Sequence, residues 1–153
     1  IKKEHIVFAA LVAIIVFGLI IGVPLSPGQI LTLVPVGLVV CFLGGAFGLL
    51  VLANLSSQRS ANQIFPFIMF PQFFLAGVFN PIVNLPPFLV ILSRIAPMTY
   101  PVDLVRGVYY MGQQEYAKTV LYHPAVDLLI IAAMFLVFMT VGTFLFVRNE
   151  RNR

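Results

Sequence analysis

Asp103 and Arg106 are the charged residues whose spacing most directly suggests a shared task, because residues three apart on a helix lie on one face. Such a pair either forms a surface ion pair with a helix cap or shapes a polar exit, and the sequence leaves both interpretations open. The chain contains no G-x-x-x-x-G-K-[ST], G-x-S-x-G, H-E-x-x-H or C-x-x-C motif. The sequence therefore predicts no catalytic residue, no bound cofactor and no metal site.

A second set of residues combines aromatic rings with one amide. Phe67, Phe70 and Phe74 recur at helical spacing and predict one aromatic face beside Gln72. In a membrane, such a face can meet acyl chains, a neighbouring helix or an apolar substrate path. Gln72 is the polar group of this segment best suited to hydrogen-bond across helices.

The composition indicates that these residues lie in a membrane and not in water. Of 153 residues, 61% are hydrophobic and 9% are charged, against about 25% charged in soluble domains. A water-soluble fold is thereby excluded. The net charge of +4 comes from only nine Lys and Arg, too few to build the basic face that nucleic-acid binding needs.

Four apolar runs are predicted to cross the membrane as helices. They comprise residues 6–23, 30–53, 64–79 and 125–147. The third run is expected to be kinked, because Pro66 and Pro71 each remove a backbone donor. An even number of crossings puts both termini on one side, and six of the nine Lys and Arg lie on that side, which predicts cytosolic termini.

Residues 80–123 are too apolar for a solvated loop and too rich in proline for a straight crossing. Pro86 and Pro87 are expected to start a short helix that stops near Ala96, because Pro97 disfavours helix at the residue before it. A second helix should open at Thr99 or Tyr100. Asp103 is then placed where the helix dipole favours a carboxylate. The predicted fold is an all-α integral membrane domain with four transmembrane helices and a re-entrant helical pair on the outer side.

Asp127 lies about three residues inside the last predicted crossing, residues 125–147. At that depth its carboxylate can reach interfacial water. A role in proton transfer is therefore not expected for it.

Three pieces of sequence stand in order on the predicted outer side. They are Phe74-Leu75-Ala76-Gly77-Val78-Phe79-Asn80-Pro81, Leu85-Pro86, and Ala96-Pro97-Met98-Thr99-Tyr100-Pro101-Val102-Asp103-Leu104-Val105-Arg106-Gly107. This series resembles the F-L-S-G-x-x-x-P, L-P and N-P-x-T-Y-x-x-D-x-x-R-G series of ABC-2 type transporter permeases. The resemblance runs from about Ser56 to the end. Ala76 and Ala96 stand where the family usually has Ser and Asn.

The resemblance implies that residues 1–153 are the carboxy-terminal part of an export permease of the type V ABC class, covering crossings three to six of six. It implies a separate ABC ATPase that binds ATP and Mg, a second permease subunit of the same or another kind, and a cell-membrane location. It also implies a translocation path along the third crossing and an outer lid. The path candidates are Phe67, Phe70, Gln72 and Phe74; the lid candidates are Pro97, Thr99, Tyr100, Asp103, Arg106 and Gly107.

Two other classes of function remain open from the residues alone. A membrane-embedded enzyme acting on a lipid-linked substrate could use Asp103, Arg106 and the tyrosines, although it lacks an evident nucleophile. A scaffold subunit without transport activity would need none of them.

Overall fold

The computed structural model describes Val16, Ile20, Gly22, residues 26–53, Leu55 and residues 58–151. The predicted crossing at residues 6–23 therefore lies almost wholly outside the described residues. Every regular element in the described part is helical, which confirms the all-α prediction. The elements are α2 (Pro27–Ala53), α3 (Gln58–Leu75), the short 3-10 helix η1 (Ile82–Asn84), α4 (Pro87–Ile95), α5 (Thr99–Tyr109), α6 (Tyr116–Thr119) and α7 (Pro124–Arg151).

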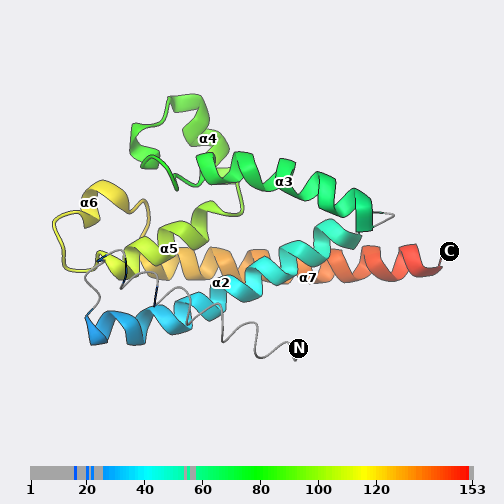
Figure 1. Ribbon diagram of the computed structural model, residues 1–153, viewed down its shortest axis with the longest axis horizontal. Helices are drawn as coiled ribbons and strands as arrows, with labels where there is room; N and C mark the ends of the chain where they lie inside the picture. The colour runs from blue at the N-terminus through cyan, green and yellow to red at the C-terminus, as the bar shows by residue number, and fades with distance from the viewer. Residues whose placement is uncertain are drawn as a thin grey trace.

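Two long helices, α2 and α7, form the axis of the structure and run in the same direction (Figure 1). Both begin with a proline, which suits the first turn because its missing N–H would be unpaired there. Both meet the length and hydropathy of a membrane span; the second span extends over Tyr116–Asn149 and so includes most of α7. These two helices match the predicted crossings at residues 30–53 and 125–147, with slightly wider bounds.

Small and polar residues hold α2 against α7. A Cβ added at Gly142 would lie 3.2 Å from the Leu50 backbone, so the helices approach closely there. Near the ends of both helices, the Asn149 side chain donates a 2.6 Å hydrogen bond to the Ala53 carbonyl. The buried apolar core lies between α2, α5 and α7. Its fully packed members are Val36, Leu43, Leu104 and Ile131.

Helix α3 differs from the predicted third crossing. It begins at Gln58, inside the polar stretch that predicted a solvated turn, and it ends at Leu75 instead of residue 79. Pro66 and Pro71 both lie inside it. The described residues hold two helices long and apolar enough to cross a membrane, or three if one bent pair counts as a span, and α3 is not among them. Its mostly polar first turns explain this, and the crossing at residues 64–79 stays a prediction.

The bent pair consists of α4 and α5, whose axes meet at 95°. Helix α4 ends at Ile95 with Ala96 as its cap, and α5 begins at Thr99, as the prolines of the sequence predicted. Helix α5 then runs back along α7 toward the end where α2 begins (Figure 1). There the Gln29 amide donates a 3.0 Å hydrogen bond to the Tyr109 carbonyl.

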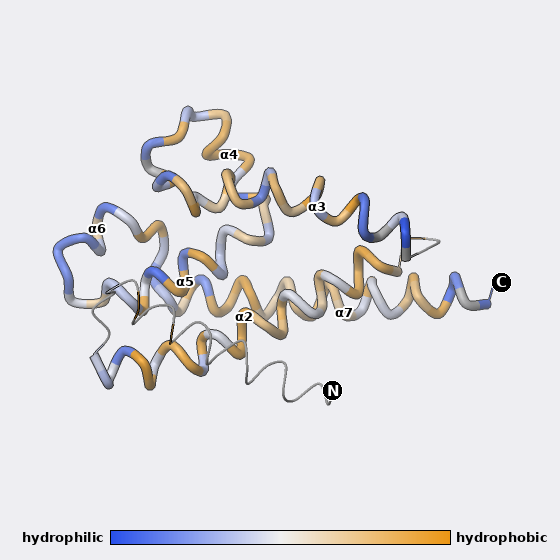
Figure 2. The backbone as a smooth tube through the Cα atoms, viewed as in Figure 1, coloured by the Kyte–Doolittle hydropathy of each residue, from blue (hydrophilic) through white to orange (hydrophobic). Residues whose placement is uncertain are grey.

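Hydropathy varies along the long axis of the structure. Figure 2 shows hydrophilic residues gathered around α6 at one end, and on the first turns of α3 and the end of α7 at the other. Between them, large apolar side chains stay exposed: Leu31 is 77% and Leu129 is 71% accessible. An apolar surface between two polar ends is the pattern of a protein that spans a bilayer.

Candidate functional site

The turn between α4 and α5 is fixed by side chains of α5 that bond back to α4. The Thr99 hydroxyl donates to the Ser93 carbonyl at 2.6 Å, and the Tyr100 hydroxyl donates to the Arg94 carbonyl at 2.6 Å. These carbonyls belong to the last turn of α4, where few backbone N–H donors remain. The Ser93 carbonyl also accepts the Ala96 N–H at 3.2 Å. Pro97 stops the helix, and the two hydroxyls add hydrogen bonds to the carbonyls at its end.

Arg106 connects α5 to the segment after α3. Its Nη2 donates a short hydrogen bond to the carbonyl of Gly77. Gly77 is buried and has a φ of +72°, a conformation that side chains with a Cβ rarely adopt. A Cβ there would also lie 2.7 Å from Cγ1 of Ile82. Two of the sequence pieces that stand far apart in the chain thus meet in one contact.

Asp103 has a different partner from the one its spacing suggested. Its carboxylate accepts hydrogen bonds from the Leu121 N–H at 2.9 and 3.1 Å and from the Tyr122 N–H at 2.8 Å. Asp103 lies beyond the first turn of α5, and only 2% of it is accessible. The predicted position at the helix dipole is therefore wrong, and so is the surface ion pair, because Asp103 and Arg106 hold separate backbone groups.

Gly107 allows α5 to approach the start of α7. A Cβ at this position would lie 2.8 Å from Cγ of Pro124. The helices can come this close only where the side chain is a hydrogen atom. Gly107 therefore sets how tightly α5 packs on α7.

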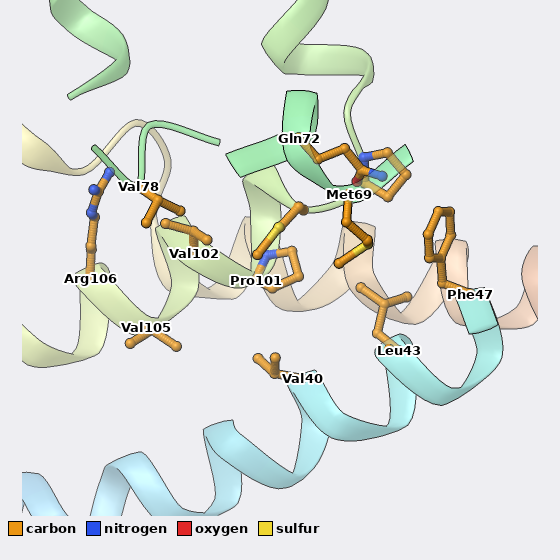
Figure 3. A pocket seen from close by; sticks show the side chains of 13 residues that line it. Val40, Leu43, Phe47, Met69, Gln72, Val78, Pro101, Val102, Val105 and Arg106 are labelled. Atoms are coloured by element: carbon orange, nitrogen blue, oxygen red, sulfur yellow. The ribbon is translucent and has the colours of Figure 1, made fainter. Parts of the chain in front are cut away.

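A cavity of about 470 Å³ lies between α2, α3 and α5 (Figure 3). Its floor in the view is one face of α2, from which Val40, Leu43 and Phe47 point into it. The α4–α5 turn and α5 close another side, and α3 contributes Met69 and Gln72. The wall is almost entirely apolar. Its single charged group is Arg106, whose guanidinium already donates to Gly77.

The structure separates the predicted path residues into two places. Gln72 is buried and lines the cavity, and its amide donates to the Ile68 carbonyl of its own helix at 3.3 Å instead of bonding across helices. Phe67, Phe70 and Phe74 lie on another face of α3 and are 82%, 63% and 56% accessible. With the two prolines of α3 they line a shallow pocket of their own. The predicted position of Gln72 beside the aromatic face is therefore wrong.

The predicted lid residues come together around the bent pair. Pro97 and Arg106 line the cavity. Thr99, Tyr100, Asp103 and Gly107 lie behind that wall and hold it through the contacts described above.

The family model of the ABC-2 type transporter matches residues 5–110. The chain belongs to the ABC-2 type transporter family. The match extends further toward the amino terminus than the resemblance noted in the sequence, which begins near Ser56. It ends at Tyr110, directly after α5. None of the curated proteins or solved structures compared with the chain matches it.

Membership in the ABC-2 family identifies the chain as a membrane-embedded transport permease domain. This agrees with its two long apolar helices and its exposed apolar surface. The series of motif residues that resembles this family lies at the bent pair and around it. Each of these polar residues of the series bonds to a backbone group. Thr99 and Tyr100 bond to carbonyls at the end of α4. Asp103 bonds to the segment before α7, and Arg106 bonds to the carbonyl of Gly77.

Sequence reasoning missed two features of this ABC-2 domain. The α2 wall of the cavity gave no signal, because α2 is apolar all round and shows no amphipathic pattern. The second is Asp127, which is fully buried, and neither of its carboxyl oxygens has a hydrogen-bond partner. The expectation that it reaches interfacial water is wrong within the described structure. Its position in the first turn of α7 offers about 0.3–1 kcal/mol of dipole stabilisation, whereas burying an ion costs several kcal/mol.

Proposed function

We propose that this ABC-2 domain is the permease subunit of an ATP-driven exporter, working with a separate ABC ATPase and a second permease subunit of the same or another kind. ATP and Mg bind to the ATPase. The family membership supports the permease role, and the motif resemblance supports the exporter class of type V architecture. Both chain termini are proposed to face the cytosol, as the distribution of Lys and Arg favours.

The observation that carries the transport proposal is the apolar cavity walled by the bent pair. A cavity of about 470 Å³ lined by aliphatic, aromatic and thioether side chains suits the apolar part of a drug, a lipid or a lipid-linked glycan. The α4–α5 pair forms its lid in this proposal. Movement of α5 would open or close the cavity, because α5 contributes the wall that contains Pro101 and Arg106.

The exposed face of Phe67, Phe70 and Phe74 is assigned to the path between two permease subunits. Its rings lie side by side, with the centroids of Phe70 and Phe74 6.3 Å apart. In one subunit they contact no buried core. A second subunit facing them would enclose an aromatic passage next to the lid.

The geometry at Asp103 speaks against the alternative of a membrane-embedded enzyme. A catalytic carboxylate must reach a substrate, whereas Asp103 is buried and accepts hydrogen bonds from two backbone N–H groups. Arg106 is likewise engaged with Gly77. In this structure both residues hold backbone groups, which suits a structural role in the proposed lid.

The decisive experiment uses inverted membrane vesicles from cells that produce the chain with its ATPase. We expect ATP to drive accumulation of a lipophilic fluorescent dye, and a P-loop ATPase to co-purify with the tagged chain. Substituting Pro97 or Tyr100, each by Ala, should reduce accumulation while membrane insertion stays intact. Equal accumulation without ATP, or purification without any ATPase, would contradict the proposal and favour a scaffold role.

A further inference from the structure

Two buried aspartates lie where α5 packs against α7, away from the residues that line the cavity. Asp127 belongs to the first turn of α7 and is fully buried, and Asp103 on α5 is 2% accessible. The two carboxyl groups lie near enough to interact with each other. The transport proposal assigns Asp103 to the lid but gives Asp127 no task.

The surroundings of the two carboxyl groups differ. Asp103 accepts hydrogen bonds from the N–H groups of Leu121 and Tyr122, which is the environment that stabilises a carboxylate. Asp127 receives no hydrogen bond at either oxygen. Two neighbouring carboxyl groups in a buried site cannot both be ionised without strong repulsion. The pair can therefore hold one negative charge stably, and the donors place that charge on Asp103.

The geometry points to a proton-binding site formed by Asp103 and Asp127, in which one proton carried by Asp127 joins α7 to α5. The protonated Asp127 donates its O–H to the Asp103 carboxylate, which still has lone pairs free after its three backbone contacts. Protonation removes the buried charge of Asp127 and gives one of its two unpaired oxygens a hydrogen-bond partner. The site is a property of the contact between α5 and α7, and only its consequence for the lid rests on the transport proposal.

The other titratable groups near the pair have partners of their own or lie at the surface. A proton is therefore the partner that we assign to Asp127. On α5, Tyr100 interacts with Asp127, and Arg106 interacts with Asp103 but donates to Gly77. Before α7, Tyr122 stacks on Tyr100, and His123 accepts a hydrogen bond at Nδ1 from Ala125. Among the described residues, Arg94 at the exposed end of α4 also acts on Tyr100. The titratable residue of α2 is Cys41, which is exposed.

A divalent metal is a poorer occupant than a proton. The described residues contain no group of three or more His, Cys, Asp or Glu that could hold a metal ion. Two carboxyl groups, one of them already bonded to backbone N–H groups, leave too few oxygen ligands for a hard cation.

The site has a consequence for the lid. With the proton bound, α5 is held on α7; without it, two adjacent carboxylates repel and the contact loosens. The stabilising proton is present at low pH and is lost as the pH rises, so alkaline conditions should release α5. Because α5 forms one wall of the cavity, occupancy of the proton site controls how that wall is held.

Infrared spectroscopy of the whole protein in lipid vesicles tests the proposal directly. We expect the wild-type protein to show a buried protonated carboxyl C=O band at neutral pH that disappears at alkaline pH. The band should be lost in Asp127→Asn and shifted in Asp103→Asn, and it should persist in Glu115→Gln, whose carboxylate is exposed. The wild-type titration alone decides the matter if a variant does not fold. Absence of the band, its survival in Asp127→Asn, or its replacement by a signal that follows sodium at fixed pH would overturn the proposal.

A distance measurement tests the coupling to α5. Cys41 is the single cysteine, so Cys41→Ala provides a background in which spin labels can be placed at Met111, after α5, and at Leu129 on α7, both exposed. The distance distribution should broaden as the pH rises in the Cys41→Ala background that keeps both aspartates. It should be independent of pH when Asp127→Asn is added, because the amide never ionises. Identical pH dependence in both backgrounds would show that the pair does not hold α5.

Discussion

The α4–α5 turn and the aromatic face of α3 were both selected from the sequence as candidate functional regions, yet the structure specifies them to very different degrees. At the turn, Ser93 and Thr99 are fully buried, and each hydroxyl donates to a defined carbonyl. On α3, Phe67 is 82% accessible and Phe70 is 63% accessible. The polar region is fixed by hydrogen bonds within the chain, whereas the rings of the apolar region contact mainly one another and Phe79 and stay largely exposed.

The difference between the polar turn and the apolar face follows from the surrounding lipid. In a bilayer, an unpaired polar group costs several kcal/mol, so hydroxyls, carboxylates and guanidinium groups must find partners and thereby fix the backbone. An apolar ring gains little by moving from acyl chains to a protein surface. Polar residues therefore define the shape of this domain, and apolar residues are available for lipid, substrate or another subunit.

The largest expected effect is at Gly77 in the polar region. Gly77→Ala combines a left-handed backbone, costing about 1–2 kcal/mol, with a clash against Ile82 and the Asn80 carbonyl, costing about 1–3 kcal/mol. We expect the free energy of unfolding in mixed micelles to fall by about 2–5 kcal/mol. The matched control is Gly112→Ala, where φ is also positive but no atom lies within 4 Å of the added Cβ. Its loss should stay near about 1–2 kcal/mol; equal losses in the two variants would refute the role of packing at Gly77.

The next effect is the loss of the Arg106 contact. Arg106→Met keeps an apolar chain of similar length but leaves the buried Gly77 carbonyl without its donor. We expect a loss of about 2–3 kcal/mol, as for other hydrogen bonds to charged groups, and reduced dye accumulation in vesicles. Arg94→Met is the control, because Arg94 is exposed at the end of α4. A similar loss from both variants in the same unfolding assay would argue that charge at this surface, not the Gly77 contact, matters.

A smaller effect is expected at Thr99. Thr99→Val preserves shape but removes the hydroxyl that donates to the Ser93 carbonyl at 2.6 Å, which costs about 1–2 kcal/mol in a membrane protein. Thr140→Val tests an exposed hydroxyl that bonds to carbonyls one turn back in α7 and should change stability by less than about 0.5 kcal/mol. Equal stability of the Thr99 and Thr140 variants would mean that the α4–α5 turn does not depend on this bond.

The same contrast explains how far the sequence could predict the structure. Prolines and polar residues act locally, so both ends of α4 and the start of α5 followed from Pro87, Pro97 and Thr99. The partners of Asp103 and Arg106 could not be predicted, because both lie outside their own helix, at Tyr122 and at Gly77.

Uniform hydrophobicity hid most of the remaining structure. Helix α2 is apolar on every face, so nothing in its pattern marked the side that lines the cavity. The close approach of α2 and α7 occurs at Gly142, a lone glycine, whereas the paired glycines Gly44 and Gly48 have no atom within 4 Å of an added Cβ. Small-xxx-small spacing, which often marks helix contacts, therefore does not mark the contact between α2 and α7.

The smallest stability effect is expected on the aromatic face, where it also separates architecture from function. Phe67→Ala should change the free energy of unfolding of the single subunit by less than about 0.5 kcal/mol, because the ring is 82% accessible. Leu104→Ala, at a fully buried core position, should lose about 2–4 kcal/mol. If the aromatic face lines the path between two subunits, Phe67→Ala should lower ATP-driven dye accumulation although stability is unchanged. Unchanged accumulation would assign the face to lipid, and a large loss of stability would show that the ring packs within the subunit after all.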